Sequence, residues 1–164
     1  MTSKNKIQSV YIESSVISYL TSKPSNDLFV LAKQHMTVLW WDRVLPHLNA
    51  YVSEYVLEEI LKGDKEASKK RANASKDFPV LNRSGSIDKL AQEYLKAAQL
   101  PKEARLDAQH IASATIFALN YLVTWNCAHI ANAFIRKKIE KVNLSVGLET
   151  PVICTPEELW EIPK

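Results

Sequence analysis

Short apolar segments alternate with longer amphipathic segments along this chain, and this alternation constrains the fold more than any other feature. The apolar segments have the length and composition of β-strands, and they lie at residues 8–13, 50–53, 78–81, 121–124 and 151–154. Each is followed by a segment with apolar residues at helical spacing. Strands that alternate with helices form parallel βαβ units. We therefore predict an α/β fold around a parallel sheet.

Capping residues and prolines predict where the helices begin and end. The expected helices are residues 14–20, 27–45, 53–63, 64–76, 86–95, 101–117, 128–141 and 156–160. Ser53 is expected to cap the third, and Pro101 suits the first turn of the sixth. The segment 38–41 could instead be a strand, because it reads Val-Leu-Trp-Trp.

The chain has the size of one domain, with 164 residues of which 46% are hydrophobic. No internal repeat or long linker divides it, so we predict a single domain over residues 1–164. No apolar run approaches the roughly 20 residues that a membrane helix needs, and no signal peptide is recognisable. We expect a soluble, cytoplasmic protein that does not contact membranes.

Several classes of site are excluded by composition. The only cysteines, Cys127 and Cys154, lie far apart and have no zinc-ligand spacing around them. All three glycines are isolated, so no glycine-rich phosphate-binding loop can be written. The formal net charge of +3 is compatible with a polyanionic partner but does not by itself indicate one.

Oxygen-bearing side chains follow several of the predicted strands. Glu13 ends the first strand, and Thr124 and Asn126 follow the fourth. Glu59 lies on the helix after the second strand, and Asp107 lies early in the helix before the fourth. Ligands bind at the carboxyl ends of the strands in open parallel sheets. We therefore expect these side chains to meet at one edge of the sheet.

Three carboxylates and an amide at one site need a counter-charge, because like charges a few ångströms apart repel strongly when they are partly desolvated. A hard divalent cation supplies that charge, and Mg²⁺ and Mn²⁺ prefer carboxylate and water oxygens. Such an ion can activate water for phosphodiester cleavage. The pattern therefore indicates a metal-dependent, nuclease-type site.

The chain resembles the PIN-domain proteins, in particular the toxin-type (VapC-like) branch found in bacterial type II toxin-antitoxin operons. The matching segments occur in the order of the family and span nearly the whole chain. They are VYIESSVISYL at 10–20, YVSEYVLEEI at 51–60, LPKEARLDAQHIASA at 100–114, LVTWNCAHIANA at 122–133 and TPVICTPEEL at 150–159. The resemblance implies a three-layer PIN-like fold, in which helices flank a central parallel sheet of four to five strands.

The resemblance also implies roles for individual residues. Glu13, Glu59, Asp107 and Asn126 take the four acidic positions of the family, with Glu13, Asp107 and Glu59 as metal ligands. Ser14 and Thr124 match hydroxyl positions that support the metal or its water. The sequence departs from the family at two of these positions. The family usually has Asp where Glu13 stands and where the neutral Asn126 stands.

Further residues have two interpretations each. His110 could orient Asp107 or a phosphate, or it could be a structural histidine; His129 and Asn132 could line the same crevice. Two basic clusters could track RNA or could be solvated helix faces: Lys62, Lys65, Lys69, Lys70, Arg71 and Lys76, and Arg136, Lys137, Lys138 and Lys141. Trp40, Trp41 and Tyr55 could form a dimer or antitoxin surface, or belong to the core.

The resulting hypothesis is an endoribonuclease that uses Mg²⁺ or Mn²⁺, is the toxin of a toxin-antitoxin pair and forms a homodimer. Its partners would be an RNA substrate and an antitoxin protein. The alternative is a catalytically weak PIN-like module that binds RNA or protein, with Asn126 as the weakened position. A small-molecule phosphatase or other α/β hydrolase is not favoured, because no nucleophile elbow is present.

Overall fold

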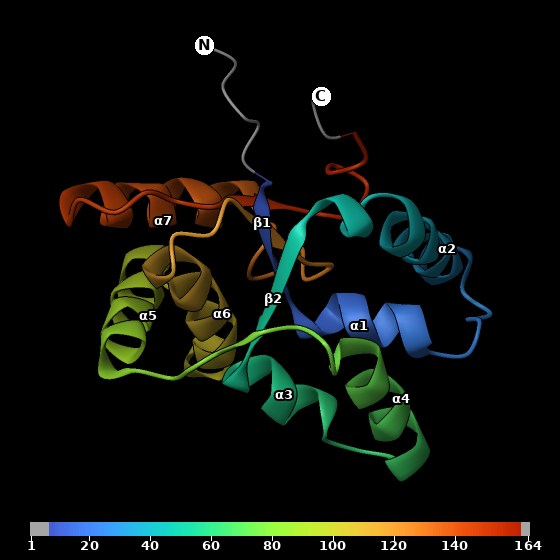
Figure 1. Cartoon of the computed structure of the whole chain (residues 1–164). Coiled ribbons are helices and arrows are strands. Elements are labelled where there is room, and N and C mark those ends of the chain that lie inside the picture. Colours follow the sequence, from blue (N-terminus) through green and yellow to red (C-terminus); the bar gives the residue numbers. More distant parts are fainter. Residues whose placement is uncertain (1–6, 162–164) are drawn as a thin grey trace.

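The computed structural model describes residues 7–161, and in it a parallel sheet separates two groups of helices (Figure 1). The strands are β1 (Ser9–Ile12), β2 (Asn49–Ser53), β3 (Val80–Leu81), β4 (Tyr121–Val123) and β5 (Val152–Cys154). All pair in parallel, in the spatial order β3-β2-β1-β4-β5. The predicted α/β class and five-stranded parallel sheet are confirmed.

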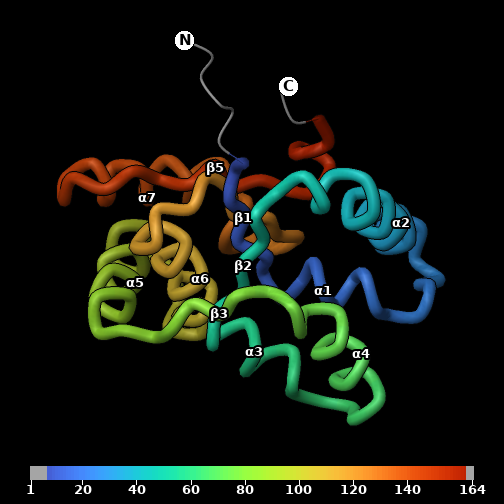
Figure 2. Tube along the Cα trace, viewed as in Figure 1, coloured from blue at the N-terminus to red at the C-terminus, as the bar shows by residue number. Residues whose placement is uncertain are grey.

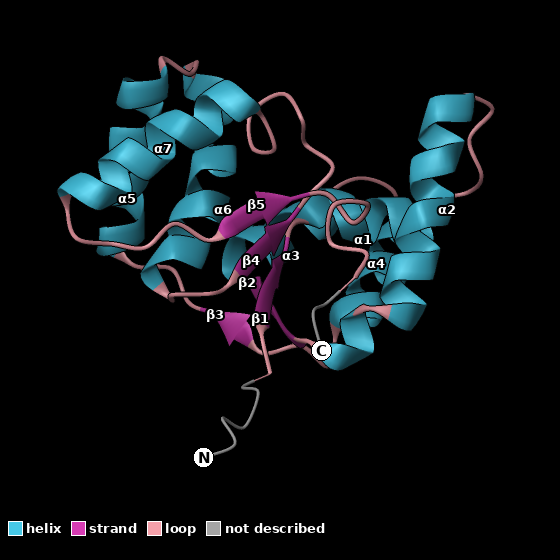
Figure 3. Ribbon diagram, turned by 90° about the horizontal axis from the view of Figure 1, so that it is seen from above, coloured by secondary structure: helices cyan, strands magenta, loops and turns pink. Residues whose placement is uncertain are grey.

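Within residues 7–161, seven α-helices surround this sheet. They are α1 (Ser14–Thr21), α2 (Leu28–Arg43), α3 (Glu54–Ile60), α4 (Lys65–Ser75), α5 (Gly85–Ala98), α6 (Arg105–Ile116) and α7 (Ala133–Ser145). Helices α5, α6 and α7 lie on one side of the sheet and α1, α2 and α4 lie on the other, as the view from above shows (Figure 3). This is the expected three-layer arrangement. No helix within residues 7–161 is long and apolar enough to cross a membrane.

The middle strand, β1, is apolar on both faces because helices cover both faces. Val10, Tyr11 and Ile12 are completely buried. The strand pairs with β2 on one side and with β4 on the other, in the register Tyr11↔Tyr51 and Tyr11↔Leu122. The carboxyl ends of β1, β2 and β4 therefore meet, and the chain runs on from β1 and β2 directly into α1 and α3 (Figure 2).

Polar side chains cap most helices, as the sequence suggests. Asp27, Ser53 and Asp64 each accept a hydrogen bond from a backbone N–H in the first turn of the helix that follows. The segment 38–41 lies within α2, so its helical interpretation is confirmed and the strand alternative is wrong. Trp40 in this segment is fully buried and its indole donates to the carbonyl of Leu159 at 3.0 Å.

The structure differs most clearly from the predicted helices in four places. Ser84, not Ser86, caps α5. The helix expected from Pro101 is a short 3-10 helix at Lys102–Ala104 followed by α6. Residues 156–160 form turns rather than a helix. The helix expected from residue 128 begins at Ala133, because Asn132 caps it and the preceding residues form a turn.

Candidate functional site

Glu13 lies at the carboxyl end of β1 and is buried, with 4% of its surface exposed. Its carboxylate accepts from the hydroxyls of Ser14 and Thr124, each at 2.6 Å, and from the backbone N–H of Ser15 at 3.1 Å. The hydroxyl of Ser15 also donates to it. No cationic side chain pairs with it within residues 7–161. The carboxylate is thus held in place entirely by hydroxyls and one amide.

Ser14 connects Glu13 to Glu59. Its hydroxyl oxygen lies 2.6 Å from Oε1 of Glu13 and 2.6 Å from Oε2 of Glu59. A hydroxyl carries a single hydrogen, so it donates to only one of these oxygens at a time. The other carboxylate oxygen then lies close to the Ser14 oxygen with no hydrogen between them, and its remaining donor is the N–H of Ser15 or the ring of His110. This arrangement favours an additional positive charge between the two carboxylates.

Glu59 pairs with His110, whose ring is fully buried. Nε2 of His110 lies 2.7 Å from Oε2 of Glu59, and Nδ1 lies 2.7 Å from the hydroxyl of Tyr11. The Tyr11 hydroxyl lies 2.6 Å from Oγ of Ser53. The hydroxyls of Tyr11 and Ser53 can each donate or accept. This series of hydrogen bonds can therefore form whether the His110 ring is neutral or charged. All polar atoms of the buried ring are therefore satisfied.

The pair shifts the pKa values of both partners. Burial alone would lower the pKa of His110, but the hydrogen bond to Glu59 and the charges of Glu13, Glu59 and Asp107 raise it above its usual value. Burial would raise the pKa of Glu59, but the hydrogen bond and charge of His110, together with Ser14, lower it. The two shifts agree, and they favour an ionised Glu59 beside a protonated His110.

Asp107 lies in the first turn of α6 and is held by two donors. The side-chain amide of Asn126 donates to its Oδ1 at 3.0 Å, and Nδ1 of His129 lies 2.8 Å from its Oδ2. Oδ1 of Asn126 accepts the backbone N–H of His129 at 3.0 Å. Asn126 therefore points its donor, not its oxygen, at Asp107.

The two parts of the site are joined by the segment after β4. The hydroxyl of Thr124 donates to Glu13 and accepts the backbone N–H of Asn126 at 2.9 Å. Burial raises the pKa of Asp107, the hydrogen bond from His129 opposes this, and the charge of Glu13 raises it further. The charge of Glu13 therefore affects the pKa of Asp107. All four predicted residues, Glu13, Glu59, Asp107 and Asn126, lie at the carboxyl edge of the sheet.

The donor set fits a divalent cation. Ligand atoms of Glu13, Glu59 and His110 all lie within 4.8 Å of one another. Carboxylates and hydroxyls are hard oxygen donors, which Mg²⁺ and Mn²⁺ prefer. This group contains His110 in place of Asp107, whose carboxylate is engaged by Asn126 and His129. The group could bind a metal ion.

The histidines differ most from the sequence-based expectation. His110 pairs with Glu59, not with Asp107, because its ring points from α6 toward β1 and α3. His129 pairs with Asp107, whereas Asn132 caps α7. Sequence reasoning assigned no role at the site to Tyr11 or Ser53, which carry ordinary core and capping patterns. The hydroxyl of Ser15, in the first turn of α1, likewise contributes to the site by donating to Glu13.

Several of the remaining candidates have structural partners or belong to the core. Arg71 donates to the carbonyls of Ile60 and Lys62, at 2.8 and 2.6 Å, and so closes the end of α3. Trp40 and Tyr55 are buried in the core, so the core interpretation is confirmed for these two aromatics, whereas Trp41 is partly buried and packs against the core.

The fold and the acidic edge define an α/β protein with a site that could hold a metal ion. A solved structure with this fold is VapC20 of Mycobacterium tuberculosis, described as a toxin that cleaves the sarcin-ricin loop. The likeness has a TM-score of 0.58 and 16% sequence identity, and covers 73% of this chain and 92% of VapC20. No family model and no curated protein sequence matches this chain. The chain thus has the fold of a VapC toxin, and the resemblance seen in its sequence is supported at the level of fold.

Proposed function

We propose that this protein is a metal-dependent endoribonuclease and the toxin of a toxin-antitoxin pair. The observation that carries the proposal is the group formed by Glu13, Glu59 and His110, whose ligand atoms lie within 4.8 Å of one another, with the Ser14 hydroxyl 2.6 Å from both glutamates. The shared fold with VapC20, which is described as a toxin that cleaves an RNA loop, supports it. The substrate would be single-stranded or structured RNA.

Glu13, Glu59 and Asp107 would hold Mg²⁺ or Mn²⁺. When bound, such an ion supplies an activated water and stabilises the developing negative charge in phosphodiester cleavage. The chain's own residues keep the site in shape for this: Ser14 and Thr124 orient Glu13, and His110 orients Glu59. Asn126 would position Asp107 through its amide. We also propose that the protein acts in the cytoplasm as a homodimer.

Cleavage of a labelled RNA by the purified protein tests the proposal. We expect cleavage with Mg²⁺ or Mn²⁺ and none with EDTA. Asp107→Asn should lower the cleavage rate by at least about 100-fold. Even the loss of a residue that only hydrogen-bonds to a metal ligand lowers metal affinity or activity by about 10 to 100-fold. Glu93→Gln, an exposed change on α5, is the matched control and should leave the rate unchanged. Cleavage that persists in EDTA, or an Asp107→Asn variant with full rate, would refute the proposal.

A second candidate function is a PIN-like module that binds RNA or a protein without cutting. The observation that favours it is Asn126, which offers Asp107 a neutral amide where the family usually has a carboxylate. Isothermal titration with Mn²⁺ distinguishes the two functions. Uptake of Mn²⁺ that is lost in Glu13→Gln favours the nuclease, whereas no uptake at millimolar concentrations favours binding alone.

A further inference from the structure

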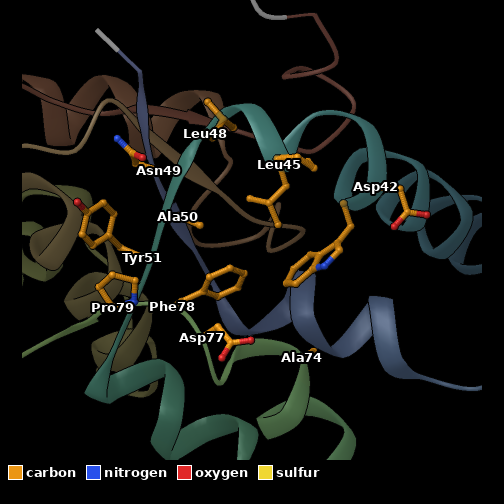
Figure 4. A pocket seen from close by; sticks show the side chains of 12 residues that line it. Asp42, Leu45, Leu48, Asn49, Ala50, Tyr51, Ala74, Asp77, Phe78 and Pro79 are labelled. Carbon is orange, nitrogen blue, oxygen red and sulfur yellow. The ribbon is translucent and has the colours of Figure 1, made fainter.

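A hollow of about 650 Å³ lies against the first half of β2, at the opposite end of that strand from Ser53. It is bordered by the carboxyl end of α2 and the 3-10 helix Leu45–His47 on one side, and by the carboxyl end of α4 on the other (Figure 4). Its volume falls in the range of ligand pockets in proteins. The acidic site described above contributes none of its lining.

The hollow exposes an open strand edge. Strand β3 pairs only with Val52 and Ser53, so the earlier part of β2 has no neighbour on that side. Asn49 donates its N–H toward β1, to the carbonyl of Gln8 at 2.9 Å, so the next residue along the strand, Ala50, turns its backbone N–H outward. Within residues 7–161 that N–H has no hydrogen-bond partner. Backbone donors on an open edge can pair with an added strand.

Aromatic rings line one wall of the hollow. The rings of Trp41 and Phe78 have centroids 5.6 Å apart at 55°, and both residues are only partly buried. In Figure 4 the ring of Phe78 points into the space between β2 and Leu45, whereas Tyr51 points to the other side of the strand. The hollow therefore wraps around the open edge of β2 and reaches both faces of the sheet.

The charged side chains that line the hollow are both acidic. Asp42 and Asp77 are exposed and have no hydrogen-bond or ion-pair partner within residues 7–161. No lysine, arginine or histidine is among the lining residues, although the chain as a whole carries a net charge of +3. A phosphate-bearing ligand would be repelled here, and a cation would be attracted.

We propose that this hollow binds an extended protein segment that carries an arginine. The segment would pair its backbone with Ala50 and so add a strand to the open edge of β2. A guanidinium group stacks on aromatic faces and pairs with carboxylates, and the hollow is lined by both kinds of side chain, by Trp41 and Phe78 and by Asp42 and Asp77. A lysine has only a compact ammonium group and matches the flat aromatic wall less well.

A peptide titration tests this inference independently of nuclease activity. The probe is a blocked pentapeptide with a central arginine and valine and threonine around it, added to the ¹⁵N-labelled protein and followed by NMR. We expect shifts at the backbone amide of Ala50 and the indole of Trp41. Replacing the arginine by citrulline, which keeps the shape and removes the charge, should weaken binding at least about tenfold. A lysine peptide should bind less tightly than the arginine peptide.

Variants locate the binding site. The double variant Asp42→Asn and Asp77→Asn should weaken binding of the arginine peptide about tenfold, while Glu93→Gln, an exposed change on α5, should not. Both changes in the double variant are on exposed side chains, and its circular dichroism and RNA cleavage should match those of the unmodified protein. Three outcomes would each overturn the inference. They are equal binding of the arginine and citrulline peptides, shifts confined to residues around Glu13 and Asp107, and no shifts at millimolar peptide.

Discussion

Nε2 of His110 lies 2.7 Å from Oε2 of Glu59, and the ring that makes this contact is completely buried. The other ring nitrogen meets the hydroxyl of Tyr11, which in turn meets Ser53. A line of hydrogen bonds thus runs from β2 across β1 to α6 and ends on a carboxylate of the candidate site. Four changes in and around this site, and one at α7, have outcomes that the geometry predicts.

Tyr11→Phe should lower the free energy of unfolding by about 1 to 3 kcal/mol, because it leaves Nδ1 of His110 and the hydroxyl of Ser53 buried without their partner. Urea unfolding followed by circular dichroism measures the change. Tyr121→Phe is the control, since within residues 7–161 the Tyr121 hydroxyl has no hydrogen bond. A loss of equal size in both variants would contradict the proposed importance of the buried chain.

The pair of Glu59 and His110 should stabilise the metal-free protein most between about pH 4.5 and 6.5. The pKa of Glu59 is lowered from 4.5, so its contribution is present above that pH and is lost as the pH falls through the folded pKa. The pKa of His110 is raised from 6.5, so its contribution is present below that pH and is lost as the pH rises through the folded pKa.

Comparing Glu59→Gln with the unmodified protein in EDTA tests this window. Urea unfolding at about pH 5.5 and about pH 8.5 gives the stability difference at each pH. The difference should be larger at the lower pH, where both partners are charged. The same difference at both pH values would show that the pair adds no pH-dependent stability.

Mn²⁺ should raise the melting temperature, because an ion that binds only the folded state stabilises it by mass action. At a concentration 100-fold above its Kd the gain is about 2.7 kcal/mol. Glu13→Gln should abolish the shift, since it removes a carboxylate that lies against Ser14 and Thr124. Differential scanning calorimetry with Mn²⁺ and with EDTA measures it, and an unchanged shift in Glu13→Gln would exclude this carboxylate as a ligand.

Asn126→Asp should destabilise the metal-free protein and increase its stabilisation by Mn²⁺. The change replaces the amide that donates to Asp107 with a second carboxylate, while the acceptor for the N–H of His129 is kept. We expect a loss of about 1 to 3 kcal/mol in EDTA, because the two carboxylates repel and a donor is missing. Asn126→Ala is the control: it loses the same donor but should show no increase in the Mn²⁺ effect.

Asn132→Ala should lower the free energy of unfolding by about 1 kcal/mol, because the Asn132 side chain accepts from the backbone N–H groups of Phe134 and Ile135 at the start of α7. Ala128→Gly should lower the free energy of unfolding much less than an alanine-to-glycine change in a helix interior does, since residue 128 lies in a turn. Thermal unfolding of the two variants compares these positions. The opposite ranking would mean that the helix begins near residue 128.

The sequence alone determined the order of strands and helices, because strand composition, helical spacing and capping are local properties. Glu13, Glu59, Asp107 and Asn126 were found from the sequence for a related reason. Glu13 and Asn126 follow strands, whereas Glu59 and Asp107 lie on helices that follow or precede strands, and the carboxyl ends of parallel strands meet at one edge. Local patterns did not predict where α7 begins. A start at Ala128 and a start at Ala133 both fit the spacing of apolar residues, and only the turn before Asn132 excludes the earlier start.

The tertiary structure alone decided which side chains meet. His110 follows Asp107 by three residues, yet it turns toward Glu59 because α6 packs beside β1, which pairs with β2, the strand that leads into α3. His129, from the segment after β4, fills the place beside Asp107 instead. Such pairings depend on the order of strands in the sheet and on the packing of helices across it. These pairings join residues that are 22 to 99 positions apart, and no pattern of neighbouring residues encodes them.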